Sequence, residues 1–449
     1  MIQRLGSTGI FIIIIFIIIA IIVDTSIVSI ATSAGGLRSS VSDIALFTFM
    51  VLVFAVGQYV ILAFLKREYK DKEGKIGGLK YHGLDWMDKS VTITQYALIT
   101  ILVSTLLQMS FMSSYHILVL NTTIFISYGL SLILLSLLAK RFFSWFKLNH
   151  NLVVLVYALA ISMISINAAI TIIYINTQLN ESPHQDYIRP VRSLTGSFTK
   201  VDVMYGSAYV LTSVLSFILI WIATVLLLRH YSRRLGKIKY WIVVSIPLVY
   251  FLSQFQSLFL YSFADLRLSN PVLFGIIYNL IFSISKPAGG VLFGIAFWTV
   301  AKRLTSKTVK SYMMISAYGM MLLFTVNQPT GLTLTPYPPF GLTSICFMVL
   351  AAYLVFLGVY SSATSVSEDS RLRQSIRKIA LRESQFLDAI GTAQMEQELQ
   401  RRVIAIYENT KNSMLNETGI SSSVDENDIK SCLQGILEEV KVEKRRKKG

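Results

Sequence analysis

A lysine lies inside a long apolar segment, next to a proline and two glycines. The segment covers residues 270–303, and in it Lys286 is followed by Pro287, Gly289 and Gly290. A charge inside a bilayer costs roughly 2.5–3.5 kcal/mol on insertion scales, so such a residue usually faces the protein interior or a wet cavity. Broken helices with freed backbone carbonyls bind solutes in transporters. These four residues therefore form a candidate ligand-binding site, in which Lys286 would attract an anion.

A structural kink explains the same residues without a ligand. In this interpretation, amide side chains of neighbouring turns accept hydrogen bonds from the ammonium group. The candidates are Asn279, Gln254 and Gln256, because no acidic residue deep in a span is expected to pair with Lys286. Both interpretations stay open at this point.

Amide side chains also lie within other apolar spans. Interhelical hydrogen bonds of about 0.6 kcal/mol each are their usual role, so they would belong to a site only if they converged on Lys286. They are Gln58, Gln95, Gln108, Asn167, Gln254, Gln256 and Asn279.

Met109, Met112 and His116 recur at helical spacing near the end of one span. Thioether and imidazole groups are ligands of copper, so a soft-metal site is one interpretation. The alternative is a packing stripe, which is the commoner role of methionine in a helix.

Motifs of known catalytic sites do not occur in the sequence. It contains no HExxH, no GxSxG and no phosphate-binding glycine loop. No histidine follows His230, and fewer than ninety residues follow the last apolar segment, which is too few for a kinase domain. We therefore expect a protein that is not an enzyme and holds no cofactor.

The composition is that of a membrane protein. Of the 449 residues, 53% are hydrophobic and only 15% are charged, whereas soluble domains average about a quarter charged. A net charge of +16 could indicate a nucleic-acid partner, but basic loops that face the cytoplasm also explain it and are the preferred interpretation. The expected partner is the lipid bilayer, and no nucleic acid is expected.

The apolar residues fall in blocks about as long as the 20 residues that cross a bilayer. We therefore predict an all-α fold, a polytopic transmembrane bundle of about ten spans within residues 1–362. The predicted spans are residues 9–30, 44–65, 91–112, 117–139, 152–175, 206–228, 240–263, 271–300, 311–326 and 342–360.

The basic residues predict the orientation. With the N-terminus in the cytoplasm, the inner loops carry nineteen lysines and arginines and the outer loops five, as the positive-inside rule requires. Two passes within 271–300 would reverse the later loops, so this segment is expected to cross once. We expect a multi-pass protein of the cell membrane with both termini in the cytoplasm.

The segment after the last span changes character. Residues 363–415 are rich in Arg, Gln, Glu and Ser, with apolar residues three and four apart, which predicts a cytoplasmic helical stalk. Residues 366–410 could bind a cytoplasmic protein or a second copy, or the helix could fold back on the inner face of the bundle. Residues 416–449 are predicted to be a flexible or short-helical tail with a polybasic end.

Several passages resemble one group of proteins. They are RFFSWFK, NLVVLVYALAISMISINA, PYPPFGLTS and GTAQMEQELQRRV, together with the stretches 226–256 and 360–380. Residues 77–407 are thereby similar to a family of multi-pass membrane proteins from ammonia-oxidising archaea. No activity is established for that family, so the resemblance implies an archaeal cell membrane and assigns no functional residue.

Two functions fit these features. The first is a sensor, receptor or scaffold that couples a membrane or external signal to the cytoplasmic helix. The second is a small-solute transporter that uses the broken helix around Lys286. A transporter built of two repeats should contain a second such break, and the first half of the chain has none. The sensor or scaffold is therefore the preferred hypothesis.

Overall fold

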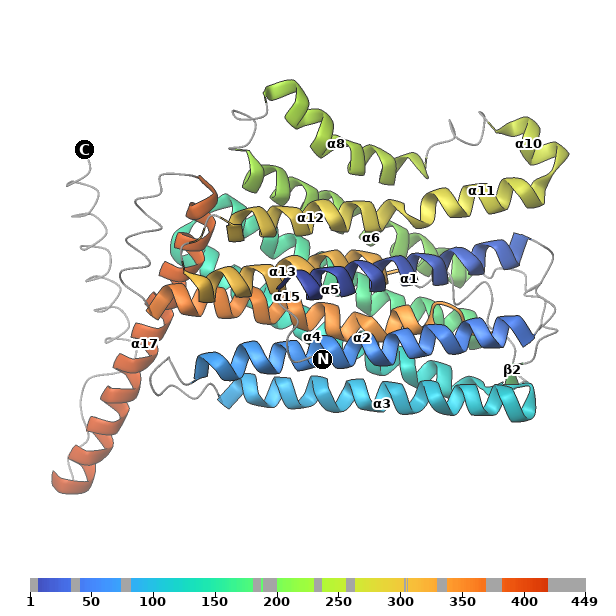
Figure 1. Cartoon of the computed structure of the whole chain (residues 1–449). Coiled ribbons are helices and arrows are strands. Elements are labelled where there is room, and N and C mark those ends of the chain that lie inside the picture. The colour runs from blue at the N-terminus through green and yellow to red at the C-terminus, as the bar shows by residue number, and fades with distance from the viewer. Residues whose placement is uncertain are drawn as a thin grey trace.

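The computed structural model is an all-α bundle of long helices that run side by side (Figure 1). It describes residues 7–33, 41–73, 82–180, 187–188, 200–229, 236–255, 263–302, 304, 306–328, 337–368 and 382–418. The predicted fold class is thereby confirmed.

The helices and strands follow in chain order. They are α1 (Ser7–Ser33), α2 (Val41–Glu73), α3 (His82–Met112), β1 (Tyr115–His116), α4 (Ile117–Asn149), α5 (Leu152–Asn180), β2 (Tyr187–Ile188), α6 (Lys200–Leu228), α8 (Lys237–Ser253), α10 (Ala264–Ser269), α11 (Pro271–Ser283), α12 (Ser285–Lys302), α13 (Lys307–Val326), α15 (Leu342–Glu368) and α17 (Arg382–Thr418). The two short strands pair antiparallel, with Tyr115 opposite Ile188.

Nine helical segments in the described part of the chain are long and apolar enough to cross a membrane. They correspond to nine of the ten predicted spans. The remaining span, predicted at 240–263, corresponds to α8, which has 17 residues and an internal proline, Pro247. Residues 256–262 of that span lie outside the described residues.

The segment 271–300 forms two helices that continue each other. Figure 1 shows α11 and α12 end to end along the bundle, consistent with a single pass. The interruption falls at Ile284, just before Lys286 and Pro287.

Helices α13 and α15 form the centre of the bundle. The most apolar part of α15 is entirely buried, and 83% of the corresponding part of α13 is buried. Two glycines let these helices approach closely: a Cβ atom on Gly319 would lie 2.6 Å from the backbone nitrogen of Val355, and one on Gly358 would lie 2.5 Å from that of Ser316. Small residues bring membrane helices together in this way, where hydrophobic burial alone does not.

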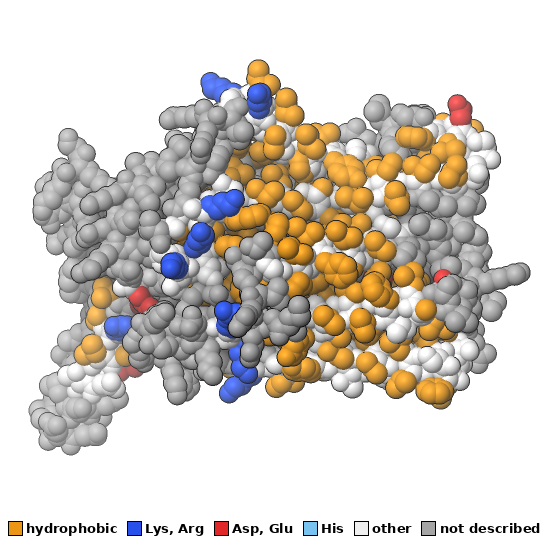
Figure 2. Space-filling model, in the orientation of Figure 1, with side chains coloured by type: hydrophobic (Ala, Val, Ile, Leu, Met, Phe, Trp, Pro, Cys, Tyr) orange, Lys and Arg blue, Asp and Glu red, His pale blue; other side chains and the backbone are white. Residues whose placement is uncertain are grey.

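Most of the described lysines and arginines gather toward one end of the molecule (Figure 2). Figure 2 shows their side chains beyond one edge of a broad apolar surface, on the side where α12 ends and α13 begins. This end is called the basic end below, and the end where α13 finishes and α15 begins is called the distal end.

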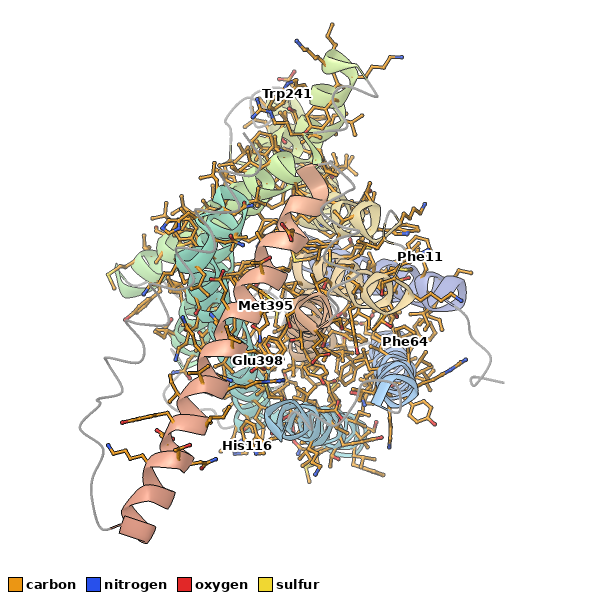
Figure 3. The ribbon with its side chains drawn as sticks, turned by 90° about the vertical axis from the view of Figure 1, so that its left-hand side faces the viewer. Phe11, Phe64, His116, Trp241, Met395 and Glu398 are labelled. Atoms are coloured by element: carbon orange, nitrogen blue, oxygen red, sulfur yellow. The ribbon has the colours of Figure 1, made fainter. Side chains whose placement is uncertain are left out.

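Helix α17 packs across the basic end (Figure 3). Its first half buries Phe386, Leu387 and Ile390 against the ends of α4, α5 and α15, as expected if the helix folds back. The second half extends beyond the bundle (Figures 1 and 3), and Ile406 there is 64% exposed. Helix α15 itself continues to Glu368, past the predicted boundary at 362.

The central contact yields a first prediction. Gly358→Ala should destabilise the protein by about 1–3 kcal/mol, because the added methyl group would overlap the backbone of Ser316. Unfolding in mixed micelles, followed by tryptophan fluorescence, measures the change in free energy. Gly129→Ala in α4 is the matched control, since its methyl group would meet no atom within 4 Å. Equal stability of the two variants would contradict the proposed role of the α13–α15 contact.

Candidate functional site

The interruption between α11 and α12 leaves one backbone carbonyl without its helical donor. Pro287 has no N–H, so the carbonyl of Ser283, four residues earlier, loses its usual partner. The side chain of Gln328 replaces it, with its Nε2 3.1 Å from the Ser283 oxygen. The Ser283 hydroxyl also lies 2.9 Å from that of Ser26 in α1. The break is therefore joined by hydrogen bonds to α1 and to the residues after α13.

Lys286 connects the same break to two other elements. Its Nζ donates to the Tyr209 hydroxyl of α6 at 3.1 Å and to the backbone carbonyl of Asn327 at 3.0 Å. Nζ also lies 5.3 Å from the centre of the Tyr209 ring, which places the cation over its face. Asn327 follows the last residue of α13, and a helix C-terminus is a favourable place for a cation.

Asn167 of α5 completes the cluster. Its Nδ2 donates to the Tyr209 carbonyl at 3.1 Å and to the Thr212 hydroxyl at 2.9 Å. Its Oδ1 accepts from Nδ2 of Asn327 at 3.0 Å. Lys286, Tyr209, Asn167, Thr212 and Asn327, called the lysine cluster below, thus join α5, α6, α12 and the end of α13.

The lysine cluster lies away from the basic end. Sixteen residues separate Lys286 from Lys302, or roughly 24 Å along a helix. In an apolar layer about 30 Å thick, the cluster therefore lies in the half nearer the distal end rather than at the midplane.

A buried acidic side chain lies in α1, the helix that Ser26 joins to the break. Asp24 of α1 has no exposed surface, and its Oδ2 accepts three hydrogen bonds: from the backbone N–H of Gly341 at 3.1 Å, and from the hydroxyls of Thr343 at 2.7 Å and Ser344 at 3.1 Å. These donors lie at the N-terminus of α15, where a helix stabilises negative charge. Asp24 therefore fastens α1 to the start of the central helix.

Sequence reasoning missed Asp24, Tyr209 and Asn327. Asp24 is the only acidic residue in the first forty, so its position in an apolar run was a usable signal. The carbonyl of Asn327 and the hydroxyl of Tyr209 carry no such signal, because a tyrosine and a helix end are ordinary features of a membrane span.

The other residues of the predicted ligand site serve packing or local bonds. A Cβ on Gly289 would lie 2.3 Å from the Phe217 ring, and one on Gly290 would lie 2.9 Å from Cβ of Phe324. Gln254 donates to the carbonyl of Phe251 in its own helix, at 2.8 Å. Gln256 and the side chain of Asn279 lie outside the described residues.

The remaining amides of the spans are dispersed, apart from Asn167. Gln95 donates to the Cys346 carbonyl at 3.4 Å, and Gln108 accepts from the His116 backbone at 3.0 Å. Gln58 is buried in α2.

The predicted metal ligands have different surroundings. Met109 is buried, whereas Met112 is 67% exposed. Nδ1 of His116 accepts from the backbone N–H of Leu118 at 3.1 Å and thereby caps α4. Within the described residues, no group of three His, Cys, Asp or Glu side chains is placed to hold a metal ion.

Asp24 supports a second prediction. Asp24→Leu should destabilise the protein by about 3 kcal/mol or more, because three buried donors would lose their acceptor. Asp24→Asn keeps an acceptor oxygen and should destabilise the protein much less. Thermal unfolding of the purified variants in one detergent compares them. If leucine were tolerated as well as asparagine, the three hydrogen bonds would not stabilise the fold.

No protein family, curated protein or solved structure matches this chain.

Proposed function

We propose that this protein is a signal-transducing membrane protein in which the lysine cluster responds to a small anionic ligand and α17 reports the change to the cytoplasm. One observation carries the proposal: a series of close helix contacts leads from the lysine cluster to α17. The positive-inside rule supports a cytoplasmic basic end, and the resemblance described above supports an archaeal cell membrane.

The series begins between α12 and α13. A Cβ on Gly294 would lie 2.7 Å from the carbonyl oxygen of Ala317, so the two backbones touch there. Lys286 and Asn327 join the same two helices near the distal end. A change at Lys286 therefore acts on α13 through a hydrogen bond and a rigid contact.

The series continues through α15 to α17. Helices α13 and α15 meet at Gly319 and Gly358, as described above. At the basic end, a Cβ on Gly391 of α17 would lie 2.3 Å from Cγ1 of Val366 in α15. Packed interfaces of this kind shift between discrete arrangements rather than deform continuously. A displacement of α13 would therefore change the surface of α15 on which α17 packs.

Hydrogen bonds from α4 also hold α17 against the bundle. Nε1 of Trp145 donates to Oε1 of Gln394 at 3.1 Å, and Nδ2 of Asn149 donates to the carbonyl of Ala389 at 2.7 Å. Hydrogen bonds of this kind contribute only about 1 kcal/mol each, so the buried side chains of Phe386, Leu387 and Ile390 contribute most of the packing of α17 on the bundle.

The outer half of α17 is the proposed output surface. Leu399, Val403 and Ile406 are four and three residues apart and therefore share one side of the helix. Leu399 and Ile406 are exposed. This side, within the predicted interaction region 366–410, is where a cytoplasmic protein or a second copy would bind.

Disulfide trapping tests the coupling. In a Cys432→Ser background, cysteines replacing Asn149 and Ala389 should crosslink readily, since these residues touch in the docked state. Lys286→Met should lower the crosslinking rate at least about threefold, because α13 loses its bond to α12 and the docked state loses population.

Lys302→Met is the matched control, because it removes a lysine from the same helix outside the cluster. Equal crosslinking rates in the two variants would refute coupling between Lys286 and α17. Small carboxylates, amino acids, ammonium and copper, screened by thermal shift on the purified protein, would identify a ligand.

A small-anion transporter is the second candidate. The observation in its favour is that Lys286 lies at a true helix interruption, the arrangement that binds solutes in transporters. In that case Lys286→Met should abolish uptake of small carboxylates into proteoliposomes, while Lys302→Met should leave it unchanged. Absence of uptake by the wild-type protein would reject this candidate and leave the signalling proposal untouched.

A further inference from the structure

A groove on the surface of the bundle has a polar end and an apolar end. It lies between α4 and α5 and has a volume of about 680 Å³. Lys140, Ser144 and Lys147 of α4 line it toward the basic end, whereas Leu132 of α4 and Ile173 of α5 line it toward the distal end. Helices α4 and α5 are antiparallel neighbours. On both walls of the groove the lining side chains become more polar toward the basic end.

The groove opens on a surface that faces lipid. Large apolar side chains beside it are exposed: Ile133 is 54% exposed, Leu137 41% and Ile166 47%. In a membrane this surface is covered by acyl chains rather than by water. The occupant of the groove is therefore a lipid or a molecule that resembles one.

The length of the groove fits one leaflet. Fifteen residues separate Leu132 from Lys147, or roughly 22 Å along α4. Half of an apolar layer about 30 Å thick is about 15 Å, and the remaining length lies at the level of the headgroups. A lipid whose headgroup lies at Lys147 would thus place a chain along the apolar walls to about the midplane.

The charges at the polar end select the headgroup. Both ammonium groups lie on exposed residues, and no ion pair between them and another described residue is present. Basic pockets between membrane helices on the cytoplasmic side bind anionic headgroups. We propose that the groove between α4 and α5 binds one anionic phospholipid of the leaflet at the basic end, with its phosphate between Lys140 and Lys147.

The site adjoins the docked half of α17. Ser144, which lines the groove, accepts a hydrogen bond from the side-chain amide of Gln397. A bound headgroup would therefore lie beside a contact that holds α17. This placement does not depend on the signalling proposal, because the groove is formed by α4 and α5 alone.

The experiment uses the full-length protein in detergent with added phosphatidylglycerol, and phosphatidylcholine as the zwitterionic comparison. Native mass spectrometry counts bound lipids, and thermal unfolding measures their effect. The wild-type protein should retain one phosphatidylglycerol in preference to phosphatidylcholine. Lys140→Gln with Lys147→Gln should weaken that binding about 30-fold, since each lysine near an anionic headgroup contributes about a fivefold gain.

Two further variants distinguish lipid binding in the groove from attraction to positive surface charge in general. Lys237→Gln with Lys239→Gln removes the same charge from exposed positions on α8 and should leave the preference intact. Ala169→Trp keeps both lysines but fills the groove, and it should reduce binding as strongly as the double lysine variant.

Four outcomes would overturn the proposal. The first is an unchanged lipid preference in the Lys140 and Lys147 variant, and the second is an equal loss in the α8 control. The third is full binding by Ala169→Trp, and the fourth is equal stabilisation by glycerol phosphate, which has no chain. Either of these last two would show that the apolar walls are not used.

Discussion

The arrangement of the bundle depends on how it satisfies one interrupted helix inside an apolar layer. Without water, an unpaired backbone carbonyl there costs several kcal/mol. Pro287 creates such a carbonyl at Ser283, and Gln328 binds it. The adjacent residue, Lys286, binds the carbonyl that α13 leaves free at Asn327. A residue after α13 thus satisfies the open carbonyl of α11, and a residue of α12 satisfies the open carbonyl at the end of α13, which fixes the interrupted helix and α13 in one relative position.

This mutual dependence gives the glycine contacts their importance. Close approach at Gly290 and Gly294 is possible only when α12 and α13 are in register, and the hydrogen bonds at Lys286 set that register. Helix α15 must likewise be in register with α13, because these two helices approach closely at Gly319 and Gly358. A helix that slid by one turn would place side chains where only hydrogen atoms fit. The bundle is therefore suited to transmit small discrete shifts, which is the physical basis of the signalling proposal.

Much of the fold could be predicted from the sequence, because apolar blocks of membrane length have few alternatives to helices. Lys286 was also evident, since a charge in such a block is costly wherever it lies. Its partners were not: the prediction named Gln254, but that side chain binds its own helix, while Tyr209 accepts the bond instead. Which residues converge depends on the rotation of each helix, and uniformly apolar helices encode that rotation weakly. Asn167 was noted as an amide within an apolar span, but only the structure shows it beside Tyr209.

Lys286 and Asp24 are each explained by the helix end that they occupy rather than by each other. Lys286 lies at the C-terminus of α13, where partial negative charge accumulates, and Asp24 lies at the N-terminus of α15, where partial positive charge accumulates. Because α13 and α15 are antiparallel neighbours, both ends fall at the distal end of the bundle. Each charged group therefore has hydrogen-bond partners of its own. A ligand that binds Lys286 would leave the donors of Asp24 in place. An anion at Lys286 would compete with the carbonyl of Asn327 for the ammonium group and weaken the bond that sets the register of α13, while Asp24 continued to hold α1 to α15. Such a ligand would let α13 shift while the rest of the bundle stays folded. A response that reaches α17 requires both.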